Sequence, residues 1–180
     1  MRIISGIYRG KKLIAPKNLP VRPTTDFAKE GLFNMLNNRI DFEGIAVLDL
    51  FAGTGNISFE FASREAELIT SVDADRGCIN FIRKTADEFK IKQIRPIRGD
   101  VFDFVKKNFG KYDVIFADPP YGLAGSENLP NDILKGKMLN EDGLLILEHS
   151  KELKFDDHPN LILNRKFGNV NFSFFEHNTD

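Results

Sequence analysis

Short apolar runs alternate with longer amphipathic segments over most of the chain. The apolar runs have the length of buried strands and cover residues 45–50, 68–73, 112–117 and 143–148, and a more polar stretch at 93–98, with isoleucines at 94 and 97, is expected to be a further strand. The intervening segments repeat apolar residues at helical spacing, and they cover residues 56–65, 76–90, 101–108 and 129–137. Strands that alternate with helices pair in parallel. The pattern therefore predicts an α/β fold, with a mostly parallel sheet and helices on both of its faces.

The first residues depart from this alternation. Residues 2–5 and 11–15 alternate weakly between apolar and polar side chains, and they flank Gly6 and Gly10. Two such runs joined by a glycine-containing turn predict a small β-hairpin. We expect this hairpin to form an N-terminal arm over residues 1–22, packed on the rest of the chain through Ile3, Ile4 or Leu13.

The remaining residues, 23–180, are expected to form one domain. A helix capped by Thr25 or Asp26 should run to about Asn38, because apolar residues recur there at helical spacing. Residues 161–163 and 170–174 flank Gly168 and Asn169, which predicts that the sheet ends in an antiparallel hairpin.

Composition places the chain among globular proteins with one core. It has 180 residues, of which 42% are hydrophobic and 28% are charged. No run of about 18 apolar residues predicts a membrane span, and the N-terminus lacks an apolar signal core. The single Cys78 excludes an internal disulfide and favours a cytoplasmic protein, in which this residue is a buried apolar side chain. The three histidines lack metal-ligand spacing, so no metal is expected.

The net charge of −1 hides a strongly basic N-terminus. Residues 1–25 contain no acidic residue but six cations, namely Arg2, Arg9, Lys11, Lys12, Lys17 and Arg22. A basic arm on a mildly acidic body favours an anionic partner, and Tyr8 could stack there on a nucleic-acid base. The alternative is a sheet edge on which lysines prevent aggregation.

Asp118-Pro119-Pro120-Tyr121 is the stretch richest in candidate chemistry, and it directly follows a strand-like run. The Asp118 carboxylate and the Pro119 carbonyl can accept both N–H groups of one exocyclic amine, while Tyr121 can stack on a planar base. These are the groups needed to hold an amino nitrogen during its modification. The alternative is a plain proline-rich turn after a strand.

A second motif is the glycine-containing turn that follows the strand at 45–50. Gly53 and Gly55 allow a tight turn into a helix, and such a turn with a helix N-terminus can cradle a nucleotide. The third glycine of the dinucleotide-binding fingerprint is replaced by Ser58. Asp73 stands about 20 residues further on, at the next strand end, where an acidic residue can bind ribose hydroxyls. Asp73 could instead cap the next helix, although Asp75 is also placed to do so.

These loops should meet at one edge of the sheet. The glycine turn, Asp73, Asp100 and Asp118 all follow strands, and ligands of open α/β sheets bind beyond the carboxyl ends of the strands. Glu148 and His149 end a strand at the same edge, and their roles are open.

The motifs resemble those of known methyltransferases. Phe51-Ala52-Gly53-Thr54-Gly55 together with Asp-Pro-Pro-Tyr is similar to class I S-adenosylmethionine-dependent enzymes that act on amino nitrogens. The segment Arg-Ile-Ile-Ser-Gly-Ile-Tyr-Arg-Gly-Lys-Lys-Leu at 2–13, with Arg-Pro-Thr-Thr-Asp at 22–26 and Glu-Gly-Leu-Phe-Asn at 30–34, resembles the RsmD family. This family comprises bacterial small-subunit ribosomal RNA guanine-N2 methyltransferases, and the resemblance extends to about residue 150.

The sequence departs from the family pattern at a few positions. Tyr8 stands where many members have Trp, Phe27 and Ala28 replace a more basic helix start, and Tyr121 stands where Phe is frequent. These departures affect details of RNA affinity and leave the reaction class unchanged.

The resemblance implies a Rossmann-like class I methyltransferase fold and a monomeric enzyme. It would transfer a methyl group from S-adenosylmethionine to a guanine N2 amine of 16S ribosomal RNA, either free or within a small-subunit particle. The implied catalytic residues are Asp118, Pro119 and Tyr121. The implied cofactor-binding residues are Thr25, Asp49, Phe51, Gly53, Gly55, Asp73, Asp100 and Val101. The implied RNA-binding residues are Arg2, Tyr8, Arg9, Lys11, Lys12 and Arg22. Asp118 is expected to need no perturbed pKa.

Some of these residues have simpler explanations, and other activities remain open. Asp49 could only satisfy loop amides, and Thr25 and Asp100 could only cap helices. An NAD-dependent dehydrogenase would share the glycine turn and Asp73 but would not explain residues 118–121. Amino-methyltransferases acting on adenine or on protein glutamine use similar motifs, and a non-catalytic RNA-binding module is a further alternative.

Overall fold

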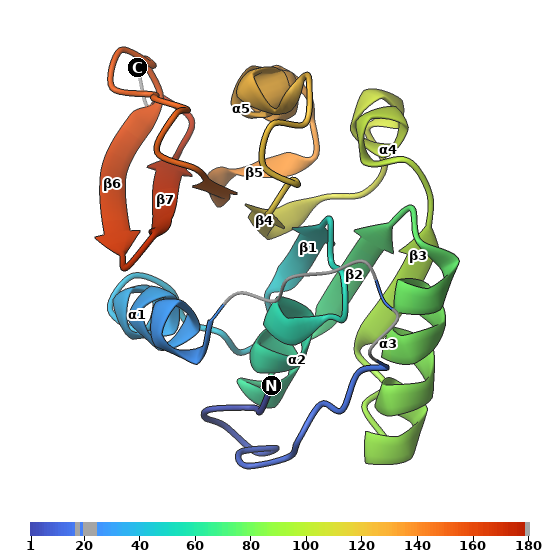
Figure 1. The fold of residues 1–180 in the computed structure, drawn as a ribbon. Helices are drawn as coiled ribbons and strands as arrows, with labels where there is room; N and C mark the ends of the chain where they lie inside the picture. The colour runs from blue at the N-terminus through green and yellow to red at the C-terminus, as the bar shows by residue number, and fades with distance from the viewer. Residues whose placement is uncertain (17–18, 20–24, 179–180) are drawn as a thin grey trace.

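The computed structural model describes residues 1–16, 19 and 25–178. Its centre is a seven-stranded sheet with the order β3-β2-β1-β4-β5-β7-β6 (Figure 1). The strands are β1 Ala46–Leu50, β2 Leu68–Asp73, β3 Ile94–Arg98, β4 Tyr112–Ala117, β5 Leu139–His149, β6 Leu161–Phe167 and β7 Val170–Phe175. Strands β1 to β5 pair in parallel, while β7 is antiparallel to both β5 and β6. The predicted mostly parallel sheet with a C-terminal antiparallel hairpin is therefore confirmed.

Helices cover both faces of the sheet, as predicted. They are α1 Asp26–Leu36, α2 Asn56–Ser63, α3 Arg76–Phe89, α4 Val101–Lys107 and α5 Leu129–Lys135. Helices α1, α2 and α3 lie on one face, and α4 and α5 lie on the other (Figure 1). Alternate residues of each strand serve the two layers: Phe116 of β4 joins the core under α1 to α3, and Ile115 joins the core under α4 and α5.

Strand β5 begins at Leu139, four residues before the predicted start. Glu141 and Asp142 lie in this extension, and both side chains are exposed. Leu139 pairs with Tyr112 and Leu144 pairs with Val114 of β4, with a register shift between the two pairs that accommodates the extension.

The N-terminal arm is a short hairpin, as the sequence predicted. Its two limbs are joined by one antiparallel bridge between Arg2 and Lys12, and by backbone hydrogen bonds from Ile3 N to Lys11 O at 2.9 Å and from Leu13 N to Met1 O at 3.0 Å. Other amides turn toward the body, since Ile4 N donates to Glu60 Oε1 at 2.7 Å and Ile7 N donates to Ser63 O at 2.8 Å. Hydrogen bonds to α2 are therefore added to the pairing within the arm.

The arm also packs on the body as predicted. Ile3 and Leu13 are buried in the same core as α1 and α2, while Ile4 is only half-buried. The expected boundary at residue 22 lies outside the described residues. Cys78 is buried and carries a free thiol, as expected of a core side chain. Within residues 1–16, 19 and 25–178, no helix is both long and apolar enough to cross a membrane.

Candidate active site at the carboxyl ends of the strands

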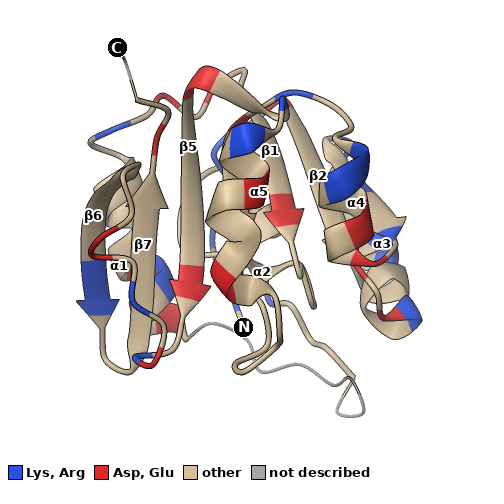
Figure 2. Cartoon of the chain, turned by 90° about the horizontal axis from the view of Figure 1, so that it is seen from above, with Lys and Arg blue, Asp and Glu red and all other residues tan. Residues whose placement is uncertain are grey.

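The predicted site residues converge because neighbouring parallel strands end in register. Leu50 of β1 pairs with Val72 of β2 and with Ala117 of β4, and Ala117 pairs with Leu147 of β5. The residues that follow these four therefore lie side by side at one edge of the sheet, and they are Phe51, Asp73, Asp118 and Glu148. Figure 2 shows β1 and β5 running in the same direction, with β7 running opposite to them. This edge is where ligands of open α/β sheets bind.

The glycine turn after β1 has the backbone conformation that its glycines favour. Gly53 and Gly55 have φ angles of 53° and 74°, in the left-handed region. Space is also limiting, because a Cβ added at Gly55 would lie 3.0 Å from Ile82 Cγ1 and 3.2 Å from Phe59 Cε2. The turn is held to the neighbouring strand by Gly53 N, which donates to Asp73 Oδ2 at 2.8 Å.

Asp75, and not Asp73, caps the following helix. Asp75 Oδ1 accepts a hydrogen bond from Cys78 N at 2.8 Å, which is N-cap geometry for α3. Asp73 Oδ1 accepts from Asp75 N at 2.8 Å, and its other oxygen holds the glycine turn. The capping alternative for Asp73 is therefore wrong, while its contact with ribose stays a prediction.

Asp49 is a buried residue beneath the glycine turn, only 2% exposed. Its Oδ2 accepts from Ser58 N at 3.0 Å and from Ser58 Oγ at 2.5 Å. Burial raises the pKa of Asp49 to about 7, against the lowering effect of the Ser58 hydrogen bonds. Ser58 thus has a structural reason to replace the third glycine, because its hydroxyl links Asp49 to Ser71 Oγ, 2.7 Å away.

Asp118 follows β4 and lies on the same face of the sheet as Asp49. Alternation along the strands puts Asp49 and Asp118 on the face of the α1–α3 core, and Glu148 of β5 as well. Burial raises the pKa of Asp118 well above its usual range, and the charges of Glu148 and Asp49 add to this effect. The sequence had led us to expect that no perturbed pKa was needed. The structure instead places three acidic groups where a positive ligand would relieve their repulsion.

The remainder of the Asp-Pro-Pro-Tyr motif forms the rim of this site. Asp118 N donates to Leu50 O at 3.3 Å, which ties the motif to the strand bearing the glycine turn. Pro119 is buried, whereas Tyr121 is 55% exposed. An exposed ring at the edge of the site is suited to stacking on a base.

Several predicted cofactor ligands also have clear structural roles. Thr25 Oγ1 caps α1 through Ala28 N at 3.2 Å, and Asp100 Oδ1 caps α4 through Asp103 N at 2.9 Å. Phe51 has a φ of 59° and packs its ring edge-to-face on Phe102. Val101 is buried under α4. Since Thr25 and Asp100 are both exposed, capping leaves them accessible to a ligand.

His149 is explained by packing. Its Nδ1 lies 2.8 Å from Ser150 O and its Nε2 lies 2.7 Å from Ser173 Oγ, which links β5 to β7. Burial lowers the pKa of His149, and the ring packs edge-to-face on Phe155. His149 therefore fixes the end of β5 next to Glu148. No signal in the sequence points to this partner, because Ser173 lies in the following hairpin.

The predicted RNA-binding residues do not gather at one point. Arg2, at the start of the arm, has a side chain 61% exposed and lies 3.5 Å from Asp26. The turn that contains Arg9 contacts Ser63 at the far end of α2, whose 8 residues span about 12 Å. Lys11 Nζ lies 4.5 Å from the centroid of the Phe89 ring. The arm therefore runs along α2, and its basic residues are spread along this helix instead of gathering at the catalytic edge.

The remaining residues of this set differ in exposure. Lys12 is exposed, but Tyr8 is half-buried against the core and its N donates to Ser63 Oγ at 3.0 Å. Packing against the core, which the sequence could not reveal, therefore covers part of the Tyr8 ring. Stacking of this ring on a base stays a prediction. Arg22 lies outside the described residues.

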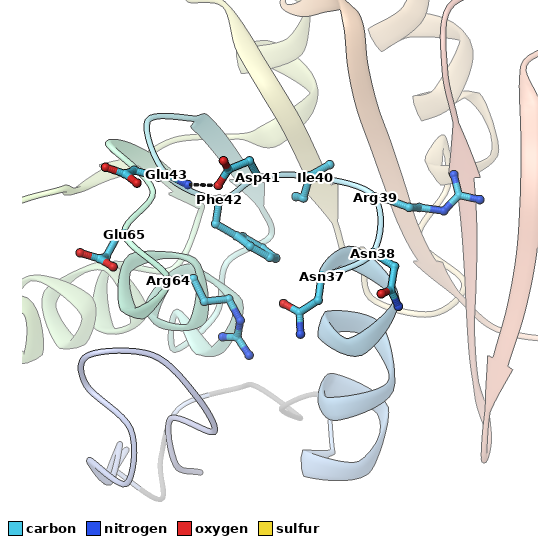
Figure 3. A pocket seen from close by; sticks show the side chains of 9 residues that line it. All are labelled: Asn37, Asn38, Arg39, Ile40, Asp41, Phe42, Glu43, Arg64 and Glu65. Carbon is cyan, nitrogen blue, oxygen red and sulfur yellow. Dashed lines mark hydrogen bonds between the residues drawn. The ribbon is translucent and has the colours of Figure 1, made fainter.

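A groove of about 580 Å³ lies away from this site (Figure 3). Its lining comes from the loop before β1 and from the end of α2, and consists of Asn37, Asn38, Arg39, Ile40, Asp41, Phe42, Glu43, Arg64 and Glu65. These segments lead into β1 and β2, so the groove is at their amino ends. It contains no predicted site residue, and we place the active site at the opposite edge. Among the described residues, no group of three or more His, Cys, Asp or Glu side chains is arranged to hold a metal ion.

Comparisons with known proteins identify the family. The family described as conserved hypothetical protein 95 matches residues 1–176. The ribosomal RNA small subunit methyltransferase D of Haemophilus influenzae is 33% identical over 156 residues, which cover 84% of this chain and 80% of that protein. The chain belongs to the RsmD family. The resemblance drawn from the N-terminal motifs is thereby confirmed.

Solved structures confirm the class I methyltransferase fold. The structure of yhhF from Escherichia coli superposes with a TM-score of 0.87 at 28% identity, covering 100% of this chain and 99% of that one. The 16S rRNA N2 G1207 methyltransferase RsmC of Thermus thermophilus, solved with AdoMet and guanosine, has a TM-score of 0.71 at 20% identity. The match covers 89% of this chain and 45% of the RsmC chain, and it shows similarity of fold alone.

Proposed function

We propose that this chain transfers a methyl group from S-adenosylmethionine to the exocyclic N2 amine of a guanine in 16S ribosomal RNA. As a member of the RsmD family with the class I fold, it is an S-adenosylmethionine-dependent methyltransferase of ribosomal RNA. The choice of the guanine N2 amine is the finer proposal. The observation that carries an exocyclic amine is Asp118 of the Asp-Pro-Pro-Tyr motif, which lies beside the glycine turn at the carboxyl end of β4. Guanine N2 is chosen among such amines because the RsmD family implies it.

The residues at this edge fit S-adenosylmethionine. It is a cation at its sulfonium, and it would meet three acidic side chains, two of which have a pKa raised by desolvation. The glycine turn would hold the methionine portion, with Gly53 and Gly55 allowing close approach. Asp73 would bind the ribose hydroxyls, and Asp100 with Val101 would meet the adenine. When bound, the group supplies an electrophilic methyl, so that neither a metal nor a covalent enzyme intermediate is needed.

Asp118 and Pro119 would prepare the nucleophile. The lone pair of the guanine amine is delocalised into the ring, which makes the nitrogen a poor nucleophile. When the Asp118 carboxylate and the Pro119 carbonyl accept its two N–H groups, the nitrogen becomes pyramidal and its developing positive charge is stabilised. Holding the nitrogen in line with the methyl group contributes through orientation.

The charge state of Asp118 follows from its surroundings. Its ionised form is the stronger acceptor for an N–H group, and a cationic ligand beside it favours that form. Once the nitrogen–carbon bond has formed, the amine carries one proton in excess. That proton can leave to Asp118 or to water. Tyr121 would stack on the base, which must first leave its own stack if it is paired.

The basic arm would supply affinity for RNA. Arg2, Arg9, Lys11 and Lys12 are exposed and would contact phosphates, as would Arg22. Because its ring is half-buried, Tyr8 would offer an RNA base only the exposed edge of that ring. Because the arm follows α2, its phosphate contacts would extend for about 12 Å from the catalytic edge. We further propose that the enzyme is a cytoplasmic monomer.

The test is to identify the modified nucleoside. Small subunits and naked 16S ribosomal RNA from cells lacking this protein would be incubated with the enzyme and labelled S-adenosylmethionine, and then digested to nucleosides. We expect N2-methylguanosine in at least one of the two substrates. A labelled methyladenine or methylglutamine would instead favour the amino-methyltransferase alternatives. The absence of label from both substrates would refute the proposal.

A further inference from the structure

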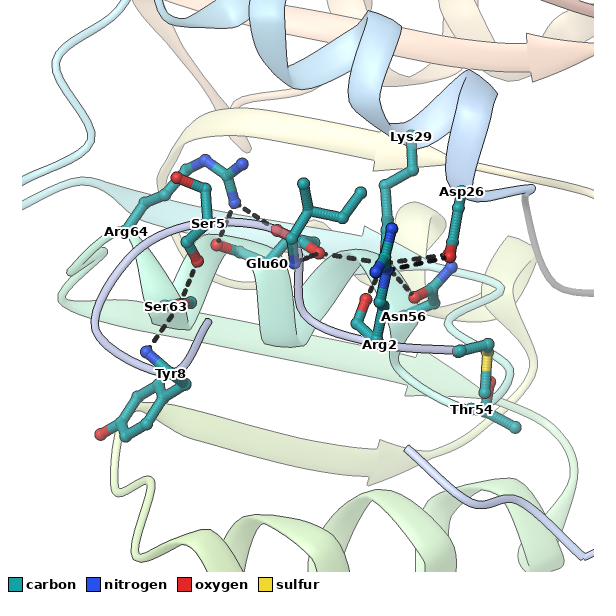
Figure 4. Close-up of polar contacts among 12 residues, drawn as sticks. Arg2, Ser5, Tyr8, Asp26, Lys29, Thr54, Asn56, Glu60, Ser63 and Arg64 are labelled. Carbon is teal, nitrogen blue, oxygen red and sulfur yellow. Dashed lines mark hydrogen bonds and ion pairs between the residues drawn. The ribbon is translucent and has the colours of Figure 1, made fainter. Parts of the chain in front are cut away.

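Lys29 is a completely buried lysine at the junction of the arm, α1 and α2 (Figure 4). Its Nζ donates to Arg2 O at 2.7 Å and to Asn56 Oδ1 at 2.7 Å, and lies 2.9 Å from Glu60 Oε1. An ammonium group has three N–H donors, so these contacts satisfy all of them. Asp26 Oδ1, at 4.0 Å, adds a weaker attraction.

Glu60 is the buried partner that completes this network. Its Oε1 also accepts from Ile4 N at 2.7 Å, and its Oε2 pairs with Arg64. The Arg64 guanidinium in turn lies 4.2 Å from the centroid of the Phe33 ring. The network therefore connects the arm, α1 and α2 through the charged groups of Lys29 and Glu60. Its other members are Arg2 and Ile4 of the arm, Asn56 of α2, and Arg64 at the C-terminal cap of α2.

Stability alone does not account for this arrangement. Removing two charges from water has a large free-energy cost, and apolar residues of similar volume often replace a buried ion pair without loss of stability. The surroundings are already apolar, since Leu32 and Phe33 of α1 are fully buried nearby in the chain. An apolar side chain at position 29 could not form the hydrogen bonds to Arg2 O and Asn56 Oδ1.

Those bonds lead directly to the cofactor turn. Asn56 is the first residue of α2 and follows Gly55. A second contact runs in parallel, since Thr54 Oγ1 donates to Met1 Sδ at 3.3 Å. At the other end of the network, Arg2 and Lys12 pair at the base of the basic arm. The arm and the glycine turn therefore share one set of buried polar contacts, although they are expected to bind different ligands.

We propose that Lys29 is a positioning residue that couples the basic arm to the Gly53–Gly55 turn, so that RNA and S-adenosylmethionine strengthen each other's binding. This inference rests on the proposed function of the two regions. RNA held by the arm fixes the backbone of Arg2. Because Lys29 bonds to both Arg2 O and Asn56 Oδ1, Asn56 is then fixed as well. The Gly53–Gly55 turn, which precedes Asn56, is thereby held in its binding conformation. The coupling must be reciprocal, because each ligand changes the affinity of the other by the same factor.

The test compares two affinities for S-adenosylhomocysteine, the demethylated and therefore unreactive product, measured by calorimetry with and without a saturating transcript of 16S ribosomal RNA. In the wild-type protein we expect the RNA to tighten binding by about fivefold or more, the lower end of typical allosteric coupling. In the double variant Lys29→Met, Glu60→Gln the ratio should fall to between about 1 and 2, because the link to Asn56 is lost while the charges of Lys29 and Glu60 are removed together, so that neither is left buried without the other. The control Lys106→Met, at an exposed position on α4, should keep the wild-type ratio.

The outcomes separate this inference from the proposed function. A double variant that keeps the wild-type ratio, or a wild-type protein with a ratio of 1, overturns the coupling even if the enzyme methylates its RNA. Failure of the wild-type protein to methylate RNA counts against the proposed function instead. If the double variant does not fold, hydrogen exchange of the wild-type protein decides the matter. Adding S-adenosylmethionine alone should slow exchange of the Ile4 amide, which bonds to Glu60, and an unchanged rate would overturn the proposal.

Discussion

Replacing Asp49 by Asn should stabilise the free protein while weakening its affinity for S-adenosylmethionine. Asp49 is buried beneath the glycine turn and its pKa is raised to about 7 by desolvation. An asparagine has nearly the same shape, and its carbonyl oxygen can still accept the bonds from Ser58 N and Oγ. The substitution therefore removes the buried charge with little change in packing.

The size and sign of the effect follow from the two pKa values. In the unfolded chain the group titrates near 3.8, so the folded state binds its proton more tightly than the unfolded state does. Stability of the wild-type protein should therefore fall as the pH rises from about 4 to about 7, by up to about 4 kcal/mol. The asparagine side chain does not titrate, so the variant has no such dependence at this position. The stability advantage of the variant should accordingly widen by about 2–3 kcal/mol between about pH 5 and pH 8.

Urea unfolding at these two pH values measures the difference directly. The control Asp132→Asn, at an exposed position on α5, should keep the wild-type pH dependence. A variant that destabilises the protein equally at both pH values would refute the reasoning about burial. Calorimetry should show that Asp49→Asn weakens S-adenosylmethionine binding by at least about tenfold, because an opposite charge near the ligand is lost. In the wild type, binding should release protons near neutral pH, and a binding enthalpy independent of the buffer would contradict this.

Three further substitutions address the other parts of the site. Asp118→Ala should raise the activation free energy by about 2.7–4 kcal/mol with little change in cofactor affinity, and a near wild-type rate in single-turnover methylation would exclude the amine-acceptor role. Asp73→Ala should weaken S-adenosylmethionine binding in calorimetry, since the ribose partner and the bond to Gly53 N are both lost; an unchanged affinity would leave Asp73 a purely structural residue. Replacing Arg9, Lys11 and Lys12 together should reduce the slope of log affinity for RNA against log salt by about 2–3 and leave cofactor binding intact. If this triple variant keeps both its salt slope and its activity, the arm is not the RNA-binding surface.

The sequence was most informative where one local rule sufficed. The strands that lead to Gly53, Asp100 and Asp118, and the one that ends at Asp73, were predicted to within about one residue. Three of them are rich in apolar residues, while Ile94–Arg98 contains two isoleucines among arginines and a proline. Their convergence followed from parallel pairing alone. The order of the sheet then brought the motifs together without any knowledge of side-chain contacts.

The sequence was less informative where contacts between distant segments decide the structure. Nothing in the residues around Ile4 shows that its amide bonds to Glu60, 56 positions away, so the sequence predicted apolar packing of the arm on the body but not these hydrogen bonds. The raised pKa of Asp118 likewise depends on Asp49 and Glu148, which belong to other strands. Lys29 went unnoticed because a lysine in a helix is normally solvent-exposed.

The buried charges of this protein lie along one route from the arm to the catalytic edge. Asp49 and Asp118 repel each other and lose hydration in the free protein, so they favour a cationic ligand at the cost of stability. Lys29 and Glu60 are paired, and they fix geometry instead of attracting a ligand. Apolar residues of similar volume often replace buried charges without loss of stability. Residues that serve activity commonly do so at the cost of stability. We therefore propose that the two arrangements have different roles: the acidic cluster favours the charge of the methyl donor, and the Lys29–Glu60 pair sets the position of the turn that would hold it.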